Sequence, residues 1–313
     1  MRIVVLGASG FIGQHLMRIL PERFPTAEIV AVARSSSAHL SSSNSSIRIL
    51  KSPIGRNPEL VAACKDAAVI VHLAWSTSPF SSNLSPVLDV EENLISNVVF
   101  LDALSAQFRG RLVFVSSGGA VYGKPVIIPV PESHPINPIT SYGISKFSVE
   151  EYISLYSTKW GFEYSILRVA NPYGPAQELK KGQGVIPAIL NSLLKNEPFV
   201  MWGDGSAIRD YIHVYDVMEA VLAAVENPKA SSNRYNIGSG KGNSILELLG
   251  LIEKLTHRKV LIDQRPARGS DIPTNVLDIS KAAAHLDWRP RISLEEGLQE
   301  TMAMNQLRLQ QNA

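Results

Sequence analysis

A glycine-rich turn near the start of the chain restricts the possible folds more than any other feature. The apolar run 3–6 (IVVL) leads directly into Gly7, Gly10 and Gly13, and a helical pattern follows over residues 14–20. In dinucleotide-binding folds the first glycine of such a turn permits the tight bend, the second lets a pyrophosphate approach the backbone, and the third lets helix and strand pack closely. The start of the helix would then face the phosphates. An ordinary strand-to-helix turn of small residues is the alternative interpretation.

The pattern of strands and helices continues beyond this turn. Further apolar runs predict strands over residues 28–33, 47–50, 69–74 and 112–115, with helices over 60–65, 91–104 and 142–160. Strands that alternate with helices predict an α/β fold, here a Rossmann-type doubly wound parallel sheet with helices on both faces. His72, near the end of a buried strand, is interpreted as structural. We expect the dinucleotide-binding domain to comprise residues 1–171 plus 207–238, and a smaller C-terminal substrate-binding domain to comprise 172–206 plus 239–313.

Composition limits the partners and the compartment. Thirty basic residues nearly balance 28 acidic ones, and the formal charge of +2 gives no reason to expect binding to nucleic acid or to an acidic membrane surface. Cys64 is the only cysteine in 313 residues, so no intrachain disulfide can form and we expect a reducing, cytoplasmic location. The apolar run before Gly7 is too short for a signal segment or a membrane span.

The end of the second predicted strand bears on the choice of cofactor. Dinucleotide-binding folds often place an acidic residue there, which binds the 2′-hydroxyl of the adenosine ribose. This chain has Ala33 at that position, followed by Arg34, Ser35 and a serine-rich run to residue 46. The missing acid removes both a hydrogen bond to the hydroxyl and the repulsion of a 2′-phosphate. A guanidinium in reach of that phosphate favours NADP over NAD, whereas an Arg34 that stacks on adenine or points into water would leave the choice relaxed.

Two groups of polar residues point to acid–base chemistry. Ser116 and Ser117 follow the strand at 112–115, and ligands of such sheets bind beyond the carboxyl ends of the strands. Tyr142 and Lys146 are four residues apart and would share one face of a helix. A neighbouring positive charge lowers the pKa of a phenol, so Tyr142 could take a proton from an alcohol or return one to an alkoxide. The serines can equally form a plain turn, and the Tyr–Lys spacing alone is a weak motif.

Taken in order, these motifs resemble the extended short-chain dehydrogenase/reductase family, and most of all its NAD(P)-dependent nucleotide-sugar epimerase/dehydratase branch, typified by UDP-glucose 4-epimerase. The resemblance covers nearly the whole chain. Its later segments are Val121-Tyr122-Gly123, Arg168-x-x-Asn171-Pro172-Tyr173-Gly174-Pro175, Gly203-Asp204-Gly205, Arg209-Asp210-Tyr211-Ile212-His213-Val214-x-Asp216 and Tyr235-Asn236-Ile237-Gly238.

The resemblance implies a role for individual residues. Tyr142 would be the general acid/base, and Lys146 its partner and a ligand of the nicotinamide ribose. The other implied cofactor-binding residues are Gly7, Gly10, Phe11, Ile12, Gly13, Leu73, Ala74 and Asn93, beside Arg34 and Ser35 at the second strand. The implied ligands of a nucleotide-diphosphate sugar are Asn171, Arg209, Arg268 and Asp271, where arginine forks match phosphate oxygens. No metal ligand is implied. The resemblance and two apolar-striped helices, 91–104 and 142–160, also imply a homodimer joined by a four-helix bundle.

The chain departs from the family pattern in ways that bear on its activity. Gly118 stands where the epimerases carry a Ser or Thr hydroxyl, so either Ser117 supplies that hydroxyl or the substrate is held differently. Our main hypothesis is a nucleotide-diphosphate-hexose 4-epimerase that acts through a transient 4-keto sugar. The alternative is an NADPH-dependent reductase of a 4-keto-6-deoxy nucleotide sugar. The 4,6-dehydratases carry an Asp-Glu pair where this chain has Gly118-Gly119, and a dinucleotide-sensing binding protein would not need the Tyr–Lys pair.

Overall fold

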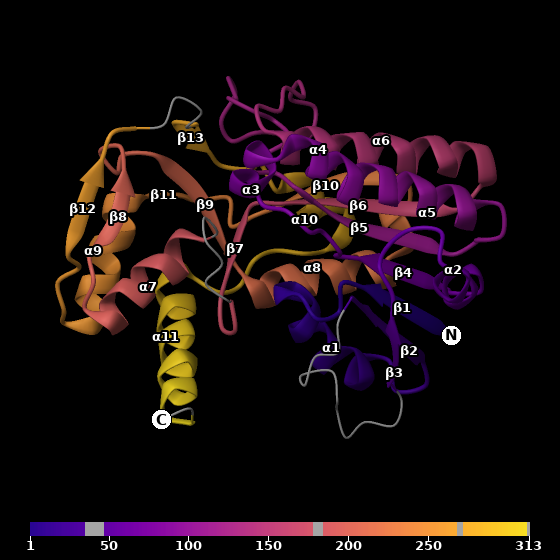
Figure 1. Ribbon diagram of the computed structural model, residues 1–313, viewed down its shortest axis with the longest axis horizontal. Coiled ribbons are helices and arrows are strands. Elements are labelled where there is room, and N and C mark those ends of the chain that lie inside the picture. Colours follow the sequence, from indigo (N-terminus) through magenta and orange to yellow (C-terminus); the bar gives the residue numbers. More distant parts are fainter. Residues whose placement is uncertain (35–46, 178–183, 268–271, 312–313) are drawn as a thin grey trace.

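The computed structural model describes residues 1–34, 47–177, 184–267 and 272–311, with side chains as far as residue 304. Its larger part is a seven-stranded parallel sheet with the order β3-β2-β1-β4-β5-β6-β10 (Figure 1). The strands are β1 (Arg2–Leu6), β2 (Glu28–Ala33), β3 (Ile47–Lys51), β4 (Val69–His72), β5 (Arg111–Ser117), β6 (Glu163–Val169) and β10 (Asn233–Ile237). The central strands consist almost wholly of apolar residues because helices cover both faces of the sheet.

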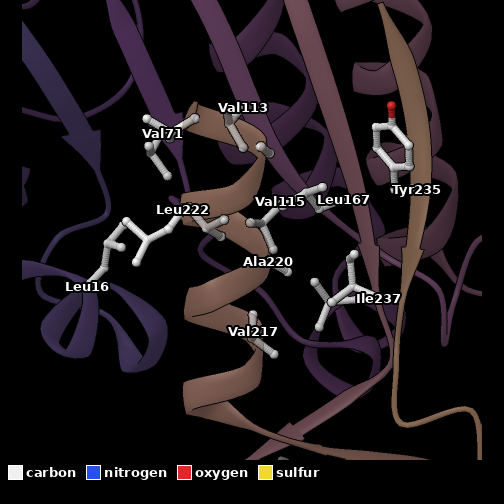
Figure 2. Packing of buried hydrophobic residues seen from close by; sticks show 14 of the residues in the cluster. Leu16, Val71, Val113, Val115, Leu167, Val217, Ala220, Leu222, Tyr235 and Ile237 are labelled. Carbon is white, nitrogen blue, oxygen red and sulfur yellow. The ribbon is translucent and has the colours of Figure 1, made fainter. Parts of the chain in front are cut away.

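Alternate residues of the strands enter two separate cores. Residues such as Val5, Val71 and Val113 face the helices α1 (Phe11–Arg23), α8 (Val214–Glu226) and α10 (Ser280–Leu286). Their neighbours, such as Leu6 and Ile70, face the helices α2 (Pro58–Lys65), α5 (Ser96–Ser105) and α6 (Ser141–Trp160). Figure 2 shows α8 lying against the first face, where Val217 and Ala220 pack among strand residues. The doubly wound parallel sheet predicted from the sequence is therefore confirmed.

The segment between β4 and α5 differs from the single helix expected over 91–104. It consists of α3 (Pro79–Leu84), α4 (Pro86–Asp89) and a π-helical turn (Val90–Ile95) that continues into α5. Ser78 and Ser81 cap the start of α3, and Pro86 lies in the first turn of α4. π-Helical turns are rare and are found frequently at functional sites. This irregular segment is therefore a candidate part of the functional site.

A smaller part of the chain packs beside the carboxyl ends of the strands. One small sheet has β7 (Asn171–Tyr173), β9 (Ile208–His213), β11 (Gly242–Ser244) and β13 (Thr274–Asn275), and β8 (Phe199–Trp202) pairs with β12 (Ile262–Arg265). Helices α7 (Val185–Lys195), α9 (Ile245–Thr256) and α11 (Leu294–Gln311) share a third core with these strands, and a 3₁₀ turn covers Pro228–Ala230. None of the described helices is long and apolar enough to cross a membrane.

One late segment returns from the smaller part to the large sheet. Leu277 is fully buried, Trp288 is almost so, and both join the core beneath α8. The Trp288 Nε1 donates to the Asp216 carbonyl oxygen at 3.0 Å. The sequence placed all of 239–313 in the smaller domain, whereas residues 277–288 pack against the sheet because their apolar side chains complete its first core. After residue 288 the chain returns to the smaller part and forms α11.

Candidate active site

The glycine turn has the shape required for a dinucleotide. Gly7 has a φ of +84°, in the left-handed region, and a Cβ there would lie 2.7 Å from the Ala74 nitrogen. A Cβ on Gly13 would lie 2.7 Å from the Ala8 carbonyl oxygen, so only glycine allows α1 to start this close to β1. Gly10 precedes the helix without a side-chain cap. The first N–H groups of α1 therefore face the cleft, where a pyrophosphate would accept from them.

The turn forms one wall of a cleft of about 610 Å³. The sheet order reverses between β1 and β4, and in open parallel sheets ligands bind outside such a reversal. The lining residues that the sequence predicted are Gly7, Gly10, Phe11, Ile12, Gly13, Leu73, Ser117, Tyr142, Asn171 and Arg209. The cleft therefore joins residues from the start, the middle and the last third of the chain.

Helix α6 presents Tyr142 to this cleft and holds Lys146 buried beside it. The helix begins where the Thr140 side chain accepts from the Gly143 nitrogen, and the Tyr142 nitrogen donates to the Ser82 hydroxyl at 3.0 Å. The Lys146 ammonium lies 5.9 Å from the centre of the Tyr142 ring and donates to the Val115 carbonyl oxygen at 2.8 Å. The tyrosine and lysine that the sequence paired by spacing are thus side by side in space.

The electrostatics of the pair differ from the expectation that the lysine would lower the pKa of the phenol. The pKa of Tyr142 is raised to about 12, chiefly by burial; a hydrogen bond with Ser117 acts to lower it, and the charge of Asp89 acts to raise it. Burial lowers the pKa of Lys146 to about 7, against the effects of Glu150 and Asp89. Desolvation therefore outweighs the attraction between the two groups. Before a cationic ligand arrives, Tyr142 holds its proton, and it is ready to act as an acid.

Ser117 is the hydroxyl-bearing residue beside Gly118, where the epimerases carry a Ser or Thr. A Cβ on Gly118 would lie 2.5 Å from a Leu277 methyl carbon and 2.9 Å from the Arg168 carbonyl oxygen. No side chain can therefore be carried at position 118 without moving a buried leucine. Ser117 lines the cleft and its hydroxyl bonds to Tyr142. Ser116 points the other way, and its hydroxyl donates to the buried Glu150 at 2.5 Å.

This division predicts different effects for the two serines. We expect Ser117→Ala to lower turnover roughly tenfold, the weight of one hydrogen bond to a reacting group. We expect Ser116→Ala to lower the thermal midpoint instead, because it removes a donor from a buried carboxylate. Steady-state rates and thermal melts on the same two variants test this. If both variants leave turnover unchanged, neither serine replaces the missing hydroxyl.

The other predicted residues fall into three groups. Asn171 and Arg209 reach the cleft, and the Asn171 amide also donates to the Asp210 carbonyl oxygen at 3.0 Å. The backbone of Ala74 lies against Gly7. Asn93 is buried and does not line the cleft; its side-chain oxygen accepts from the Ser76 backbone nitrogen and hydroxyl. Ser35, Arg268 and Asp271 lie outside the described residues.

Arg34 directly follows the last residue of β2. Its side chain is 67% exposed, and its Nη1 lies 3.9 Å from Glu92. Ala33 before it is buried. Among the described residues no group of three or more acidic, histidine or cysteine side chains could hold a metal ion.

Two residues next to the Tyr142–Lys146 pair were not identified from the sequence. Trp75 follows β4 and lines the cleft, and the Lys146 ammonium lies 3.9 Å from the centre of its indole ring. A desolvated cation gains about 2 kcal/mol from such a ring face. Asp89 lies behind the pair and is fully buried. A strand-end tryptophan and a single aspartate carry no motif, and only the lone charge among the apolar residues 86–90 could have drawn attention to Asp89.

A glycine turn opposite a tyrosine–lysine pair, across a cleft at the reversal of a parallel sheet, defines a dinucleotide-dependent enzyme that moves a proton and a hydride at one carbon. Residues 3–238 match the NAD dependent epimerase/dehydratase family, and the chain belongs to this family. The resemblance noted from the motifs is thereby confirmed.

The relatives agree along nearly the full length. The chain is 35% identical over 303 residues to a putative UDP-glucose 4-epimerase of Methanocaldococcus jannaschii, covering 96% of this chain and 97% of that protein. A crystal structure of the Thermotoga maritima UDP-glucose 4-epimerase with UDP-glucose superposes with a TM-score of 0.91 at 32% identity, covering 99% and 100%. The UDP-glucuronic acid 4-epimerase of Bacillus cereus, in complex with UDP-glucuronic acid and NAD, gives 0.89 at 26% identity, covering 98% and 100%.

Proposed function

We propose that this protein is a UDP-hexose 4-epimerase that acts through a transient 4-keto sugar. The observation that carries the proposal is the contact of Tyr142 with Ser117 and its proximity to Lys146, in a cleft that the glycine turn also lines. The full-length similarity to UDP-glucose 4-epimerases supports UDP as the nucleotide.

Each residue then has a distinct task. Bound NAD would supply the hydride chemistry, taking hydride from C4 of the sugar and returning it to the opposite face. Tyr142 takes the proton of the 4-hydroxyl and later gives it back. Ser117 holds the same oxygen through its hydroxyl, and Lys146 orients the ribose and stabilises the phenolate. Arg209 and Asn171, which line the cleft, would bind the diphosphate and so anchor the sugar while it turns over.

One experiment separates this function from the reductase alternative. The purified protein is incubated with UDP-glucose and then with UDP-galactose, and the products are followed by proton NMR while dinucleotide absorbance is recorded. An epimerase brings both substrates to the same mixture with no net change in absorbance. A protein that leaves both sugars unchanged, yet oxidises NADPH stoichiometrically with a 4-keto-6-deoxy nucleotide sugar, is the reductase.

We propose in addition that the two parts of the chain bind different ligands. Residues 1–171 with 207–238 would bind the dinucleotide, and 172–206 with 239–313, apart from the returning segment 277–288, would bind the nucleotide sugar. The glycine turn and α6 support the first assignment, and Pro172 and the cleft-lining segment 184–187 support the second. A cytoplasmic location is part of the same proposal, and the single cysteine, Cys64, is a buried free thiol.

We also propose that the chain prefers NADP(H) to NAD(H), although its family is NAD-dependent. Ala33 removes the acid that would repel a 2′-phosphate, and the exposed Arg34 can bind that phosphate by turning away from Glu92. We expect roughly tenfold tighter binding of NADPH than of NADH, reduced from the full value of a charged hydrogen bond by solvent and salt. Ala33→Asp combined with Arg34→Asn should level or reverse the preference. Calorimetry that finds NADH bound more tightly by the unaltered protein would refute it.

A homodimer built on α5 and α6 is the last part of the proposal. Leu84, Val87, Ile95, Ile144 and Leu155 lie on this side of the molecule, and each is between 50 and 71% exposed. Buried between two copies, they would supply the apolar centre of an interface.

Light scattering at micromolar concentration should therefore give twice the chain mass. We expect Val87→Glu to yield monomers, and Leu246→Glu, an equally apolar position on the distant α9, to leave the mass unchanged. A monomeric mass for the unaltered protein would exclude the dimer.

A further inference from the structure

A single buried carboxylate joins the three segments that surround the Tyr–Lys pair. Asp89, at the end of α4, is 0% exposed. Its Oδ1 accepts hydrogen bonds from the Thr77 hydroxyl and from the Asn93 amide, the latter at 3.1 Å. Its Oδ2 accepts from the Ser141 hydroxyl at 2.9 Å and from the Ser145 hydroxyl at 2.7 Å. Four donors satisfy this carboxylate, so it is a built site and not a buried charge without partners.

The donors are placed so that they act on the catalytic helix. Ser141 and Ser145 flank Tyr142 by one and three residues, and Ser145 directly precedes Lys146. Both bonds therefore fix the rotation of the first turn of α6 about its axis. Thr77 belongs to the segment that carries Trp75, and Asn93 lies on the π-helical turn. The irregular helix geometry brings Asp89 and Asn93 to the same polar cluster.

The same carboxylate also adds a negative charge beside the pair. The ionisable groups that act on or face Lys146 are Asp89, Glu150 one turn along α6, His72 at the end of β4, and Tyr142. Asp89 raises the pKa of both Tyr142 and Lys146. Glu150 raises the pKa of Lys146 but is tied to Arg168 by a buried ion pair, so Asp89 is the carboxylate that influences both members.

We propose that Asp89 is a positioning residue for the acid–base pair: it anchors the first turn of α6 through Ser141 and Ser145, and its charge sets the pH range over which Tyr142 and Lys146 work. This proposal rests on the proposed function of the same site. Asp89 does not line the cleft, and it acts through the two residues that do the chemistry or orient the ligand.

The test compares pH profiles of epimerisation for the full-length, NAD-loaded protein and its Asp89→Asn variant. Asparagine keeps the size of the side chain and removes the charge. Catalysis needs an ionised Tyr142 and a protonated Lys146, so the two limbs of the profile report the pKa values of these two groups. Removing a negative charge lowers both pKa values, so both limbs should move to lower pH by about half a unit or more, and the plateau should fall several-fold because Ser141 and Ser145 lose a charged acceptor.

Ser148→Ala is the matched control on the same helix. Its hydroxyl donates only to the Ile144 carbonyl oxygen, and the variant should reproduce the parent profile. An Asp89→Asn profile with a lower plateau but unmoved limbs would show a merely structural role and overturn the proposal. Should Asp89→Asn fail to fold, Ser145→Ala decides, because it removes the 2.7 Å bond with no change in charge. Its kcat should fall several-fold with KM unchanged, and a kcat equal to that of the parent would overturn the anchoring role.

A second measurement does not require turnover. The ultraviolet phenolate absorbance of the NAD-loaded protein is titrated for the parent and for Asp89→Asn, each against its own Tyr142→Phe version, so that only Tyr142 contributes to the difference. The phenolate should appear at lower pH in Asp89→Asn. If the parent protein epimerises nothing, the proposed function fails, yet this titration still decides the effect of Asp89. Identical phenolate curves would overturn it.

Discussion

Replacing Tyr142 by phenylalanine should lower turnover at least about a hundredfold, the usual weight of a positioned acid–base group. The substitution keeps the ring, which packs edge-on to Trp75 with 5.9 Å between ring centres, and removes only the hydroxyl that carries the proton. The fold and the dinucleotide affinity should persist. Rates with UDP-glucose, thermal melts and calorimetry with NAD measure these three quantities on one preparation.

Tyr152, on the same helix and partly exposed, provides the control. Tyr152→Phe removes an identical hydroxyl ten residues along the helix and away from the cleft, and its turnover should equal that of the parent. A Tyr142→Phe enzyme that retains most of its activity would move the acid–base role to another residue, and Ser117 would be the first to examine.

The largest loss of stability is expected from Arg168→Met. Arg168 is 2% exposed and its Nη2 lies 2.7 Å from the Glu150 carboxylate, while its Nη1 donates to the Tyr122 hydroxyl at 3.0 Å. Methionine would leave Glu150 buried with the Ser116 hydroxyl and a longer contact, 3.4 Å, to Arg234 as its remaining partners. Breaking a buried pair in this way costs about 3–5 kcal/mol. The unfolding midpoint in denaturant should fall accordingly.

Arg23→Met is the matched control, since Arg23 makes a close pair with Glu226 at the surface of the molecule. Exposed pairs contribute little to the free energy of unfolding, so the midpoint should hardly change. Equal losses for the two variants would mean that burial does not govern the weight of the Arg168 pair. Because Ser116 donates to the same Glu150, the Ser116→Ala loss should become smaller in the Arg168→Met background.

Local pattern was sufficient to predict most of the sheet. The strand predicted over 28–33 coincides with β2, and the helix predicted over 142–160 differs from α6 by one residue. These elements are long, apolar or amphipathic, and bounded by clear signals such as Gly161, which ends α6 with a φ of +78°. The single helix predicted over 91–104 was not found, because the π-helical turn there is stabilised by distant partners and not by local preference.

Part of the site was predictable for the same reason, and part was not. Tyr142 and Lys146 are neighbours within one helix, so their spacing alone placed them together. Three of the four donors to Asp89 lie 12 to 56 positions away in the sequence, and no local pattern reveals that the fold brings them together. The raised pKa of Tyr142 was also beyond the sequence, because burial, which depends on the whole fold, outweighs the charge of the neighbouring lysine.

The return of residues 277–288 to the large sheet has a consequence for how the protein is made. The first core contains Ile3 at one extreme and Trp288 at the other, so a nascent chain emerging from the ribosome cannot close this core until nearly all of it has been synthesised. Contacts between residues so far apart in sequence form slowly, and apolar surface stays open meanwhile. The Asp216 carboxylate accepts from the Arg291 and Ile292 nitrogens, so its hydrogen bonds also cannot form until those residues have been synthesised. Co-translational folding of the first half alone is therefore incomplete, and the first core of the growing polypeptide stays open until residues 277–288 have been translated.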